Sequence, residues 1–377
     1  MINLVGGTNF EGYDIALQKS FDFLEYDDAI IPSKSAFCQF RQTVSYEFFR
    51  DQYTDLIKQN EHNRPKYKGF KISAVDGDQY YLPRTDDLES NEYKGHSCEN
   101  SRETYYLKMY VSLVVDCITG VPVNFFYSNS LNENEIAEKQ YIPSTKKDEI
   151  SIYDRLYLSE ELINAHYSAN SYFIARTKIK STFKCIDEFC NGELNSVDVT
   201  INRHNVRLIK VNYNDSIYTF CTNIPKEIMS DEEISTLYRY RWEVETCNKS
   251  LTHIMKIEQF HTGFLNGILQ EIYTSLWLNA FIKIIISSQT NMEKDFYNKI
   301  YKRSNFKLLF VKMVSIFWKF LFGNKDEFII NITKLVLNYR ETRKRYSRSY
   351  PRETKQSDKN KYPRRSTIPQ KTSPPKT

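Results

Sequence analysis

The sequence FKISAVDGDQYYLP, residues 70–83, combines a β-rich run with the acidic turn sequence Asp76-Gly77-Asp78. We expect Asp76 to lie where this strand leaves the sheet, because Asp and Gly favour turns. The next segment, residues 105–129, contains two β-rich runs joined by Asp116 to Gly120, which is a hairpin signal. Together these three runs predict a three-strand meander.

Helical and strand patterns alternate after the meander. A short helical stretch in residues 133–142 precedes the strand EISIY, which Asp154 follows directly. A helix in residues 159–168 and a strand in residues 171–178 come next. These pieces predict β-α-β units, so we expect a mixed α/β sheet with acidic residues at the strand ends.

Helical regions flank this sheet on both sides. Within residues 1–65 we expect charged helices, one with Ser35 as its N-cap and an amphipathic one through Tyr46 to Ile57. Short β runs up to about residue 224 predict a β-rich insertion, and residues 230–340 have the pattern of several helices with apolar faces.

Composition excludes several classes of protein. The chain has 377 residues, 41% of them hydrophobic, so it is not wholly disordered. Its apolar runs are too short for a membrane helix, and its start does not resemble a signal peptide. The 11 glycines do not have the spacing of a P-loop or of a dinucleotide-binding fold. Seven scattered cysteines indicate a reduced, cytoplasmic compartment.

The charge of the chain is distributed unevenly. Residues 340–377 contain 13 Lys and Arg against three acids, a net charge of +10, which leaves −5 for the remainder of the +5 total. Such a basic, proline-containing tail is predicted to be disordered and to attract nucleic-acid phosphates. The alternative is a terminus that only increases solubility.

Two sets of residues could carry chemistry. Asp76 and Asp154 both follow strands, so they could share a metal ion, although each alone is more often a turn aspartate. In TLYRYRWEVETCNKSLTHIMK, a stripe of polar and charged side chains lies along one helical face: Tyr238, Arg241, Glu245 and Lys249. The alternative for this stripe is a solvated face with ion pairs. Glu243 should point away from it, and Trp242 and Val244 should be buried.

The ordered pieces AVDGDQYYLP, IYDRLYLSEELI, YFIARTK, TFCTNIP and ISTLYRYRWEVE, with QFHTG and GILQEIY after them, resemble the DDE transposases of the insertion sequence 4 type. That family has Asp-Gly after its first strand, Asp-Arg-Gly-Tyr after its fourth, and the helix signature Tyr-x2-Arg-x3-Glu-x6-Lys. The resemblance covers roughly residues 30–355. Asp76, Asp154 and Glu245 match the family's three acids.

The resemblance implies a ribonuclease H-like mixed sheet flanked by helices, with the β-rich insertion before the last catalytic helix. Its parts would be a shortened N-terminal helical DNA-binding region (1–65), the catalytic core (66–177 and 230–290), the insertion (178–229), C-terminal helices (291–340) and a basic disordered tail (341–377). The implied activity is metal-dependent cut-and-paste transposition, in which element ends are cut and joined to target DNA by a dimer. DNA would be the partner, and no membrane is involved.

The resemblance also implies roles for individual residues. Asp76, Asp154 and Glu245 would hold two Mg²⁺ ions, for which Mn²⁺ could substitute, with Asp76 between them. Arg241 and Lys249 would bind phosphates, and Tyr238 would contact DNA near the cut. Arg155 and Tyr157 would either support the turn at Asp154 or contact DNA.

Two positions depart from the family pattern. Thr252 stands where the family has the signature Lys, and Leu156 stands where it has Gly. Lys249, one helical turn earlier, could replace the missing Lys. Three alternatives therefore stay open: a nuclease of the same fold that cuts without joining, a transposase-derived DNA-binding protein without catalysis, and a structural protein whose acids are caps.

Overall fold

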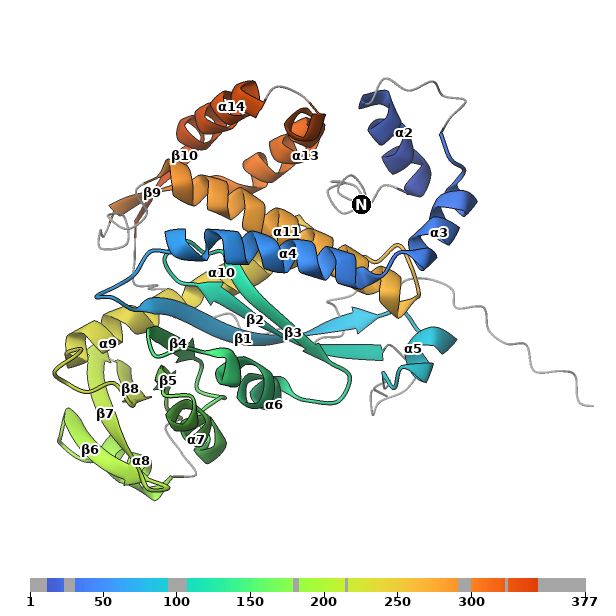
Figure 1. The fold of residues 1–377 in the computed structure, drawn as a ribbon. Coiled ribbons are helices and arrows are strands. Elements are labelled where there is room, and N and C mark those ends of the chain that lie inside the picture. The colour runs from blue at the N-terminus through green and yellow to red at the C-terminus, as the bar shows by residue number, and fades with distance from the viewer. Residues whose placement is uncertain are drawn as a thin grey trace, which may run out of the picture. The chain divides into compact units, whose positions relative to one another are not determined.

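A computed structural model describes residues 12–23, 31–93, 107–178, 183–213, 216–290, 300–322 and 325–344 (Figure 1). Residues 1–343 form one compact unit, and residues 344–377 are a second unit. Nearly all of the predicted disordered tail therefore lies outside the described residues. No described helix combines the length and apolar character needed to cross a membrane.

One mixed sheet organises the compact unit. Its eight strands have the spatial order β3-β2-β1-β4-β5-β8-β7-β6. Neighbouring strands are antiparallel except for β1 with β4 and β4 with β5, which are parallel. Their bounds are β1 Lys71–Leu82, β2 Leu107–Asp116, β3 Pro122–Ser128, β4 Glu149–Tyr153, β5 Tyr172–Arg176, β6 Ser196–Ile201, β7 His204–Tyr213 and β8 Ser216–Thr222.

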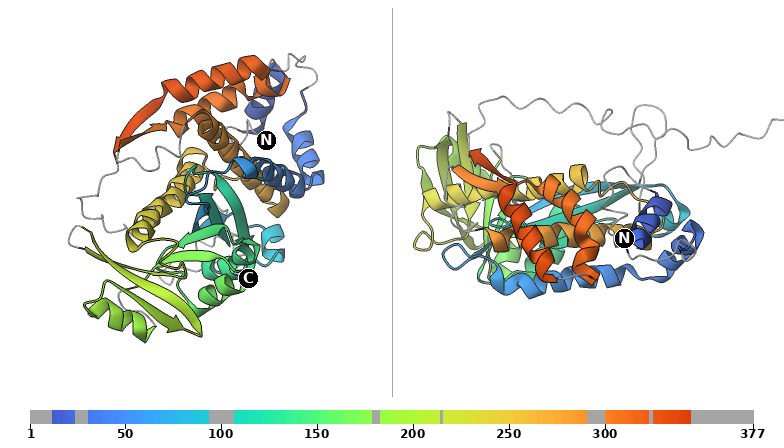
Figure 2. Two further views of the ribbon diagram at one scale, coloured as in Figure 1. Left: turned by 60° about the vertical axis from the view of Figure 1, so that its left-hand side comes forward. Right: turned by 90° about the horizontal axis from the view of Figure 1, so that it is seen from above.

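Helices cover both faces of this sheet. Helices α4 and α11 run alongside each other on one face of β1 to β3, whereas α6 and α7 lie on the other (Figures 1 and 2). The helices are α2 Tyr13–Phe23, α3 Lys34–Thr43, α4 Tyr46–Asn60, α5 Asp86–Ser90, α6 Glu133–Ile136, α7 Glu160–Ser168, α8 Lys184–Asn191, α9 Asp231–Tyr238, α10 Trp242–Lys249, α11 Leu265–Gln289, α13 Phe306–Phe322 and α14 Lys325–Asn338. Strands β9 (Ile300–Ser304) and β10 (Arg340–Lys344) form a separate two-stranded sheet.

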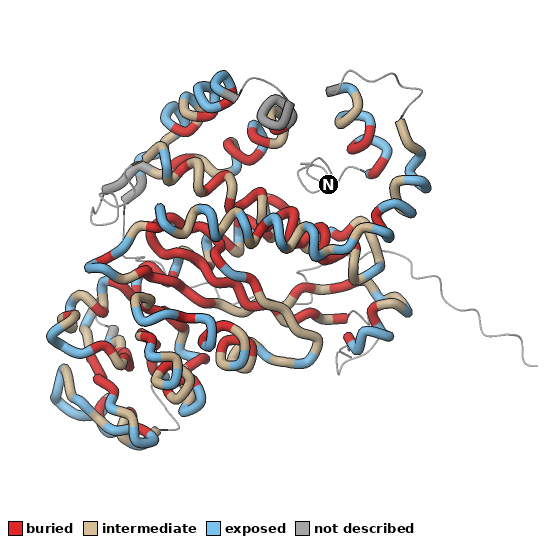
Figure 3. The backbone as a smooth tube through the Cα atoms, viewed as in Figure 1, coloured by how far each residue is buried: buried red, intermediate tan, exposed pale blue. Residues whose placement is uncertain are grey.

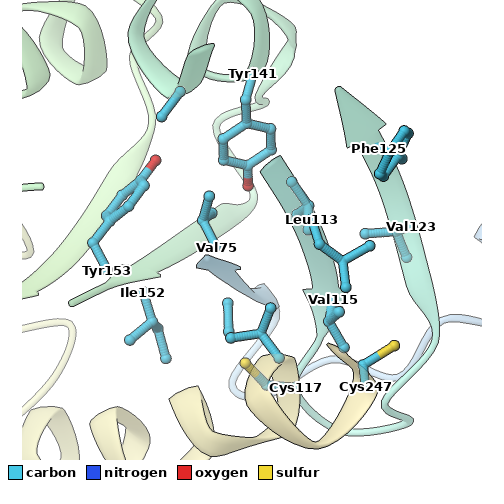
Figure 4. Close-up of a cluster of buried hydrophobic side chains, with 14 of the residues drawn as sticks. Val75, Leu113, Val115, Cys117, Val123, Phe125, Tyr141, Ile152, Tyr153 and Cys247 are labelled. Atoms are coloured by element: carbon cyan, nitrogen blue, oxygen red, sulfur yellow. The ribbon is translucent and has the colours of Figure 1, made fainter. Parts of the chain in front are cut away.

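The hydrophobic core lies along the central strands and against α11. Most positions of β2, β4 and β5 are buried, as are the first five residues of β1 (Figure 3). Side chains on the two faces of the sheet pack against buried residues of the covering segments, which include Tyr141 after α6 and Cys247 on α10 (Figure 4). The sheet is therefore a rigid platform, and residues at its strand ends have fixed positions.

The turn of the first hairpin is held by a buried ion pair. Arg64 Nε donates to Asp116 Oδ2 at 2.5 Å, and both side chains are almost fully buried. The other carboxylate oxygen of Asp116 accepts from the backbone N–H groups of Ile118 and Thr119. Arg64 also donates to Ser73 Oγ of β1, so one side chain connects the turn to the strand that carries Asp76.

The predicted mixed sheet is confirmed, as are its meander and its β-α-β unit. Strand β1 differs from the prediction, because it continues to Leu82 and places Asp76 inside the strand. The acidic sequence does not end the strand because β2 pairs with β1 from Ser73 to Leu82, including Asp76 with Leu113. On its other side, β1 pairs with β4 only as far as Ala74, whose partner is Ile152.

Other boundaries also differ from the sequence-based predictions. Ser33, not Ser35, caps α3, since its hydroxyl accepts from the backbone of Ala36. The β-rich insertion forms β6 to β8 as predicted, but it also contains α8, and its strands extend the main sheet through β8 and β5. The helix predicted through residues 236–256 is divided into α9, a 3-10 turn, α10 and a π-helical turn.

Candidate active site

The parallel pairing of β1 with β4 brings two predicted site acids to one level of the sheet. Ala74 pairs with Ile152, so the same register continued by two residues places Asp76 opposite Asp154. Neighbouring strands lie about 5 Å apart. The two carboxylates therefore leave adjacent strands at the same edge, where β4 has ended.

Asp76 is half-buried among charged side chains. Burial raises the pKa of its carboxyl to about 7, the Arg241 guanidinium opposes this rise, and the carboxylates of Glu245, Glu133 and Asp78 add to it. The carboxylate of Asp76 therefore lies within the electrostatic reach of both α10 and the start of α6.

The turn after β4 positions Asp154. The backbone N–H of Tyr157 donates to the carbonyl of Asp154 at 3.1 Å, and the hydroxyl of Tyr238 donates to Asp154 Oδ1 at 3.4 Å. Arg155 and Leu156 are exposed, whereas Tyr157 is 1% exposed. Because the Tyr157 side chain is buried, its position favours the first of its two predicted roles, support of the turn at Asp154.

The α9–α10 segment contributes a buried guanidinium. Arg241 Nη2 donates to Glu245 Oε1 at 2.6 Å, and the Arg241 charge also interacts with Asp76 and Asp154. Its Nε, within the part of the chain that is described, is buried without a hydrogen-bond partner. Three predicted acids thus surround one buried cation.

The predicted stripe on this segment is only partly correct. Tyr238 and Arg241 are buried and face the acids, but Lys249 is exposed at the end of α10. Among the described residues, neither Lys249 nor Arg155 has an ion pair with the three acids. The division of the helix explains the difference, because the 3-10 turn at Arg239–Arg241 changes which residues share a face.

Neighbouring residues on α10 give one confirmation and one correction. Glu243 points away from the site as predicted and forms an ion pair with Arg303 of β9 at 2.9 Å. Val244 is buried as predicted, but Trp242 is 37% exposed. The indole lies instead beside the Arg241 guanidinium, 5.5 Å from it.

Two further acids lie in this region that were not predicted from the sequence as site residues. Asp78 lies two residues after Asp76, which places both side chains on one face of β1, and it accepts from Asn248 Nδ2 at 2.7 Å. Glu133, the first residue of α6, lies against Gly77: a Cβ on that glycine would be 2.3 Å from Glu133 Oε2. The alternation of side chains along a strand could have predicted that Asp78 lies on the same face as Asp76. The position of Glu133 could not be predicted in this way, because it depends on how α6 packs against β1.

Carboxylate oxygens are the ligands that Mg²⁺ prefers in proteins. Asp76, Glu133, Asp154 and Glu245 supply them, and three neighbouring carboxylates raise the pKa of Asp76, so the residues fit a divalent cation. No three potential ligands in the described ranges are already close enough to form a complete metal site. Arg241 partly neutralises the acids in this structure, through Glu245 in particular.

Comparison with known proteins shows the family to which the chain belongs. The sequence model of a family described as "Transposase DDE domain" matches residues 67–278, which are 212 of the 377 residues and include every acid discussed above. A protein of Synechocystis sp., assigned as the transposase for insertion sequence element IS4SA, is 24% identical over 178 residues. The alignment covers 46% of this chain and 52% of that protein, so the chain spans about half the length of this relative.

Among solved structures, a piggyBac transposase synaptic complex with hairpin DNA is similar to 88% of this chain and 68% of its own, with 10% identity and a TM-score of 0.43. The family match, by contrast, covers more than half of the sequence and includes all of strands β1 to β8. The chain therefore belongs to the DDE transposase domain family.

Proposed function

We propose that this protein is a DNA transposase that cuts the ends of a mobile element and joins them to target DNA. The observation that carries the proposal is the convergence of Asp76, Asp154 and Glu245 on one buried guanidinium, that of Arg241. Family membership supports the same conclusion. Convergence of three acids that are 78 and 91 residues apart in the chain is not needed for stability, because like charges in a half-buried site repel one another.

The three acids are proposed to hold two Mg²⁺ ions, with Asp76 between them. When bound, these ions stabilise the negative charge on the attacking and leaving oxygens of an in-line displacement. Mn²⁺ has similar ligand preferences and is expected to substitute. The hydroxyl of Tyr238 keeps the Asp154 carboxylate oriented, and burial of Tyr157 fixes the turn from which Asp154 projects.

Arg241 is proposed to bind the scissile phosphate. Its Nη2 is used by Glu245, but its buried Nε–H remains available to a phosphate oxygen. The exposed residues Lys249 and Arg155 lie farther out and are proposed to contact the phosphates of flanking nucleotides. Tyr238 is proposed to lie beside the strand being cut, because its hydroxyl contacts Asp154 and its ring packs against Phe220 with centroids 4.8 Å apart.

The proposed reaction has two steps that need no covalent protein intermediate. In the first, a water oxygen attacks the phosphorus and the P–O3′ bond breaks, which leaves a 3′-hydroxyl and a 5′-phosphate. In the second, that 3′-hydroxyl attacks a phosphorus of the target, whose own P–O3′ bond breaks. In the first step one proton of the water goes to the leaving O3′, and the other is lost when the new 5′-phosphate ionises. In the second step the proton of the attacking hydroxyl goes to the leaving O3′, and the number of phosphodiester bonds is conserved.

Joining two ends requires two active sites, so we propose that a homodimer holds both ends of the element. The DNA substrate places the activity in the cytoplasm, at the nucleoid. The N-terminal helices are proposed to take part in recognising the element ends.

The test is cleavage of DNA duplexes that carry the element's own ends, in Mg²⁺ or EDTA, followed on sequencing gels together with a labelled target. Wild-type protein is expected to cut and to join only with Mg²⁺, and Asp154→Asn to do neither. Asp148→Asn is the matched control, since the Asp148 side chain is 41% exposed and forms an ion pair with Lys66 at the surface. It should retain full activity.

The other outcomes separate the alternatives. Cleavage without joined products would identify a nuclease of this fold. Specific binding of the ends with no cleavage under any metal would identify a DNA-binding protein in which Leu156 or Thr252 has abolished catalysis. Cleavage that Asp154→Asn retains would contradict the proposed site.

A further inference from the structure

We propose that Glu133 is a fourth carboxylate of the cation site, and that it binds the divalent ion held by Asp76 from the α6 side of the sheet. This inference rests on the proposed function, because it concerns the same cation. It adds a ligand that lies outside the three matched acids and on a different element.

The side chain of Glu133 lies directly against β1 at Gly77. A Cβ on Gly77 would lie 2.3 Å from Glu133 Oε2 and 2.4 Å from Glu133 Cβ. Only glycine therefore allows the glutamate side chain to pack directly against β1 at the residue next to Asp76. Since β4 no longer pairs with β1 at this level, the glutamate can reach the sheet edge where Asp154 also projects.

Specific hydrogen bonds hold α6 in this position. Asn132 caps the helix in a capping box with Glu135, and Asn134 Nδ2 donates to the carbonyl of Leu156 at 3.1 Å. The second of these bonds ties the start of α6 to the turn that carries Asp154. Glu133 lies between Asn132 and Asn134 in the chain, so these bonds hold it in a fixed position relative to the acids.

The charges around Glu133 also favour a bound cation. Glu133 is half-buried, and within the described ranges it has no ion pair. Its charged neighbours include Asp154 and Asp78, both acidic. Arg241 compensates the acids on the α10 side, whereas the charged groups that act on Glu133 among the described residues, Asp154 and Asp78, are acidic. A divalent cation would remove this repulsion.

An independent observation points to a ligand at the same place. The hydroxyl of Tyr157 is fully buried and, among the residues described, has no hydrogen-bond partner. Its electrostatic neighbours are Glu133, Asp76 and Asp154, so it faces the acids. A buried hydroxyl of this kind is satisfied by a bound group, and a hydrated cation between Glu133 and Asp76 provides one.

The experiment measures Mn²⁺ binding to the full chain without DNA by isothermal titration calorimetry, beside thermal unfolding in EDTA. Glu133→Gln is expected to weaken Mn²⁺ binding about 10-fold or more. It should not lower the unfolding temperature in EDTA, because it removes a repulsive charge. Glu133→Asp keeps the charge and should recover part of the affinity.

The matched control is Glu135→Gln on the same helix. It makes the same charge change two residues away, and Gln still completes the capping box, so Mn²⁺ affinity should equal that of the wild type. Asp76→Asn is the reference variant and should abolish binding.

Each remaining outcome has a definite meaning. Wild-type affinity in Glu133→Gln together with lost binding in Asp76→Asn would overturn the role of Glu133 alone. Unchanged binding in both would overturn the proposed cation site itself. A lower unfolding temperature for Glu133→Gln in EDTA would make Glu133 a structural residue and would also overturn the proposal.

Discussion

At the scale of single residues, Gly77 determines what can approach Asp76. The side of β1 that Gly77 faces is occupied by Glu133, and the opposite side at Asp76 faces Arg241 and Glu245. The glycine is needed here for space and not for an unusual backbone conformation, because its φ is not positive.

We predict that Gly77→Ala displaces the start of α6. Overpacking of this kind costs about 1–3 kcal/mol of unfolding free energy. Urea unfolding should show that loss, and Mn²⁺ affinity should fall because Glu133 no longer reaches Asp76. Gly12→Ala is the control, since its new Cβ would have no atom within 4 Å. Wild-type stability and Mn²⁺ affinity in Gly77→Ala would contradict the packing described.

A second residue-scale prediction concerns His166 on α7, which is fully buried between Tyr153 and Ser171. Burial lowers its pKa to about 3 from an ordinary value of 6.5. The unfolded chain therefore binds a proton below pH 6.5 that the folded protein does not, so stability is lost as pH falls from 6.5 towards 3. The contribution is about 1.4 kcal/mol per pH unit.

Unfolding free energies measured from pH 7.5 to pH 4.5 should show that slope, and His166→Asn should remove it. His62→Asn, at an exposed position, should leave the slope unchanged. An equal slope in wild type and His166→Asn would show that His166 is protonated in the folded protein.

At the scale of elements, the β2–β3 hairpin depends on Arg64. Its guanidinium holds Asp116 in the turn and Ser73 in β1, and all of this is buried. Breaking a buried pair leaves an uncompensated charge and costs about 3–5 kcal/mol, whereas an exposed pair contributes about 0–1 kcal/mol.

We therefore predict that Asp116→Ala lowers the free energy of unfolding by about 3–5 kcal/mol. Asp148→Ala, which breaks the exposed pair with Lys66, should change it by less than about 1 kcal/mol. Chemical denaturation of both variants makes the comparison. Equal effects of the two substitutions would contradict the assigned role of Asp116.

Most of the sheet could be predicted from sequence because its strands are local β-rich runs separated by turn residues. The hairpin at Asp116 is an example. The division of α9 from α10 could not be predicted from sequence, because Tyr238, Arg241 and Glu245 fit one continuous helical face. The tertiary environment, in which Arg241 is buried among acids, selects the 3-10 turn.

The candidate site shows the same limit. Asp76, Asp154 and Glu245 were predicted through a family pattern, and the structure brings them together. Glu133 was not predicted, because its position depends on a contact between α6 and Gly77 that is 56 residues distant in the chain. The burial of Tyr157 likewise follows from packing against Tyr153 and not from its own segment.

At the scale of the compact unit, Arg41 joins the N-terminal helices to the core. This buried side chain donates to Gln270 Oε1 and to the carbonyl of Gly267, and it pairs with Glu271 at 3.0 Å. All three acceptors are on α11, the longest helix. The region proposed to recognise DNA ends is therefore attached rigidly to the helix that packs over the catalytic sheet.

We predict that Arg41→Ala loosens this attachment, because the buried Glu271 carboxylate would lose its guanidinium partner and keep only its contacts with His261. Limited trypsin digestion should cut within residues 12–43 faster than in the wild type. Arg50→Ala, which removes an exposed side chain of α4, should leave the rate unchanged. An unaltered digestion pattern for Arg41→Ala would show that other contacts suffice.

The most direct test of the central claim is the position of the cation itself. We would crystallise the protein with a DNA duplex carrying an element end and with Mn²⁺, and measure anomalous diffraction. We predict anomalous peaks about 2.1 Å from carboxylate oxygens of Asp76, with Asp154, Glu245 and Glu133 as the other ligands. Peaks elsewhere, or none near Asp76 while the same crystals contain cleaved DNA, would contradict it.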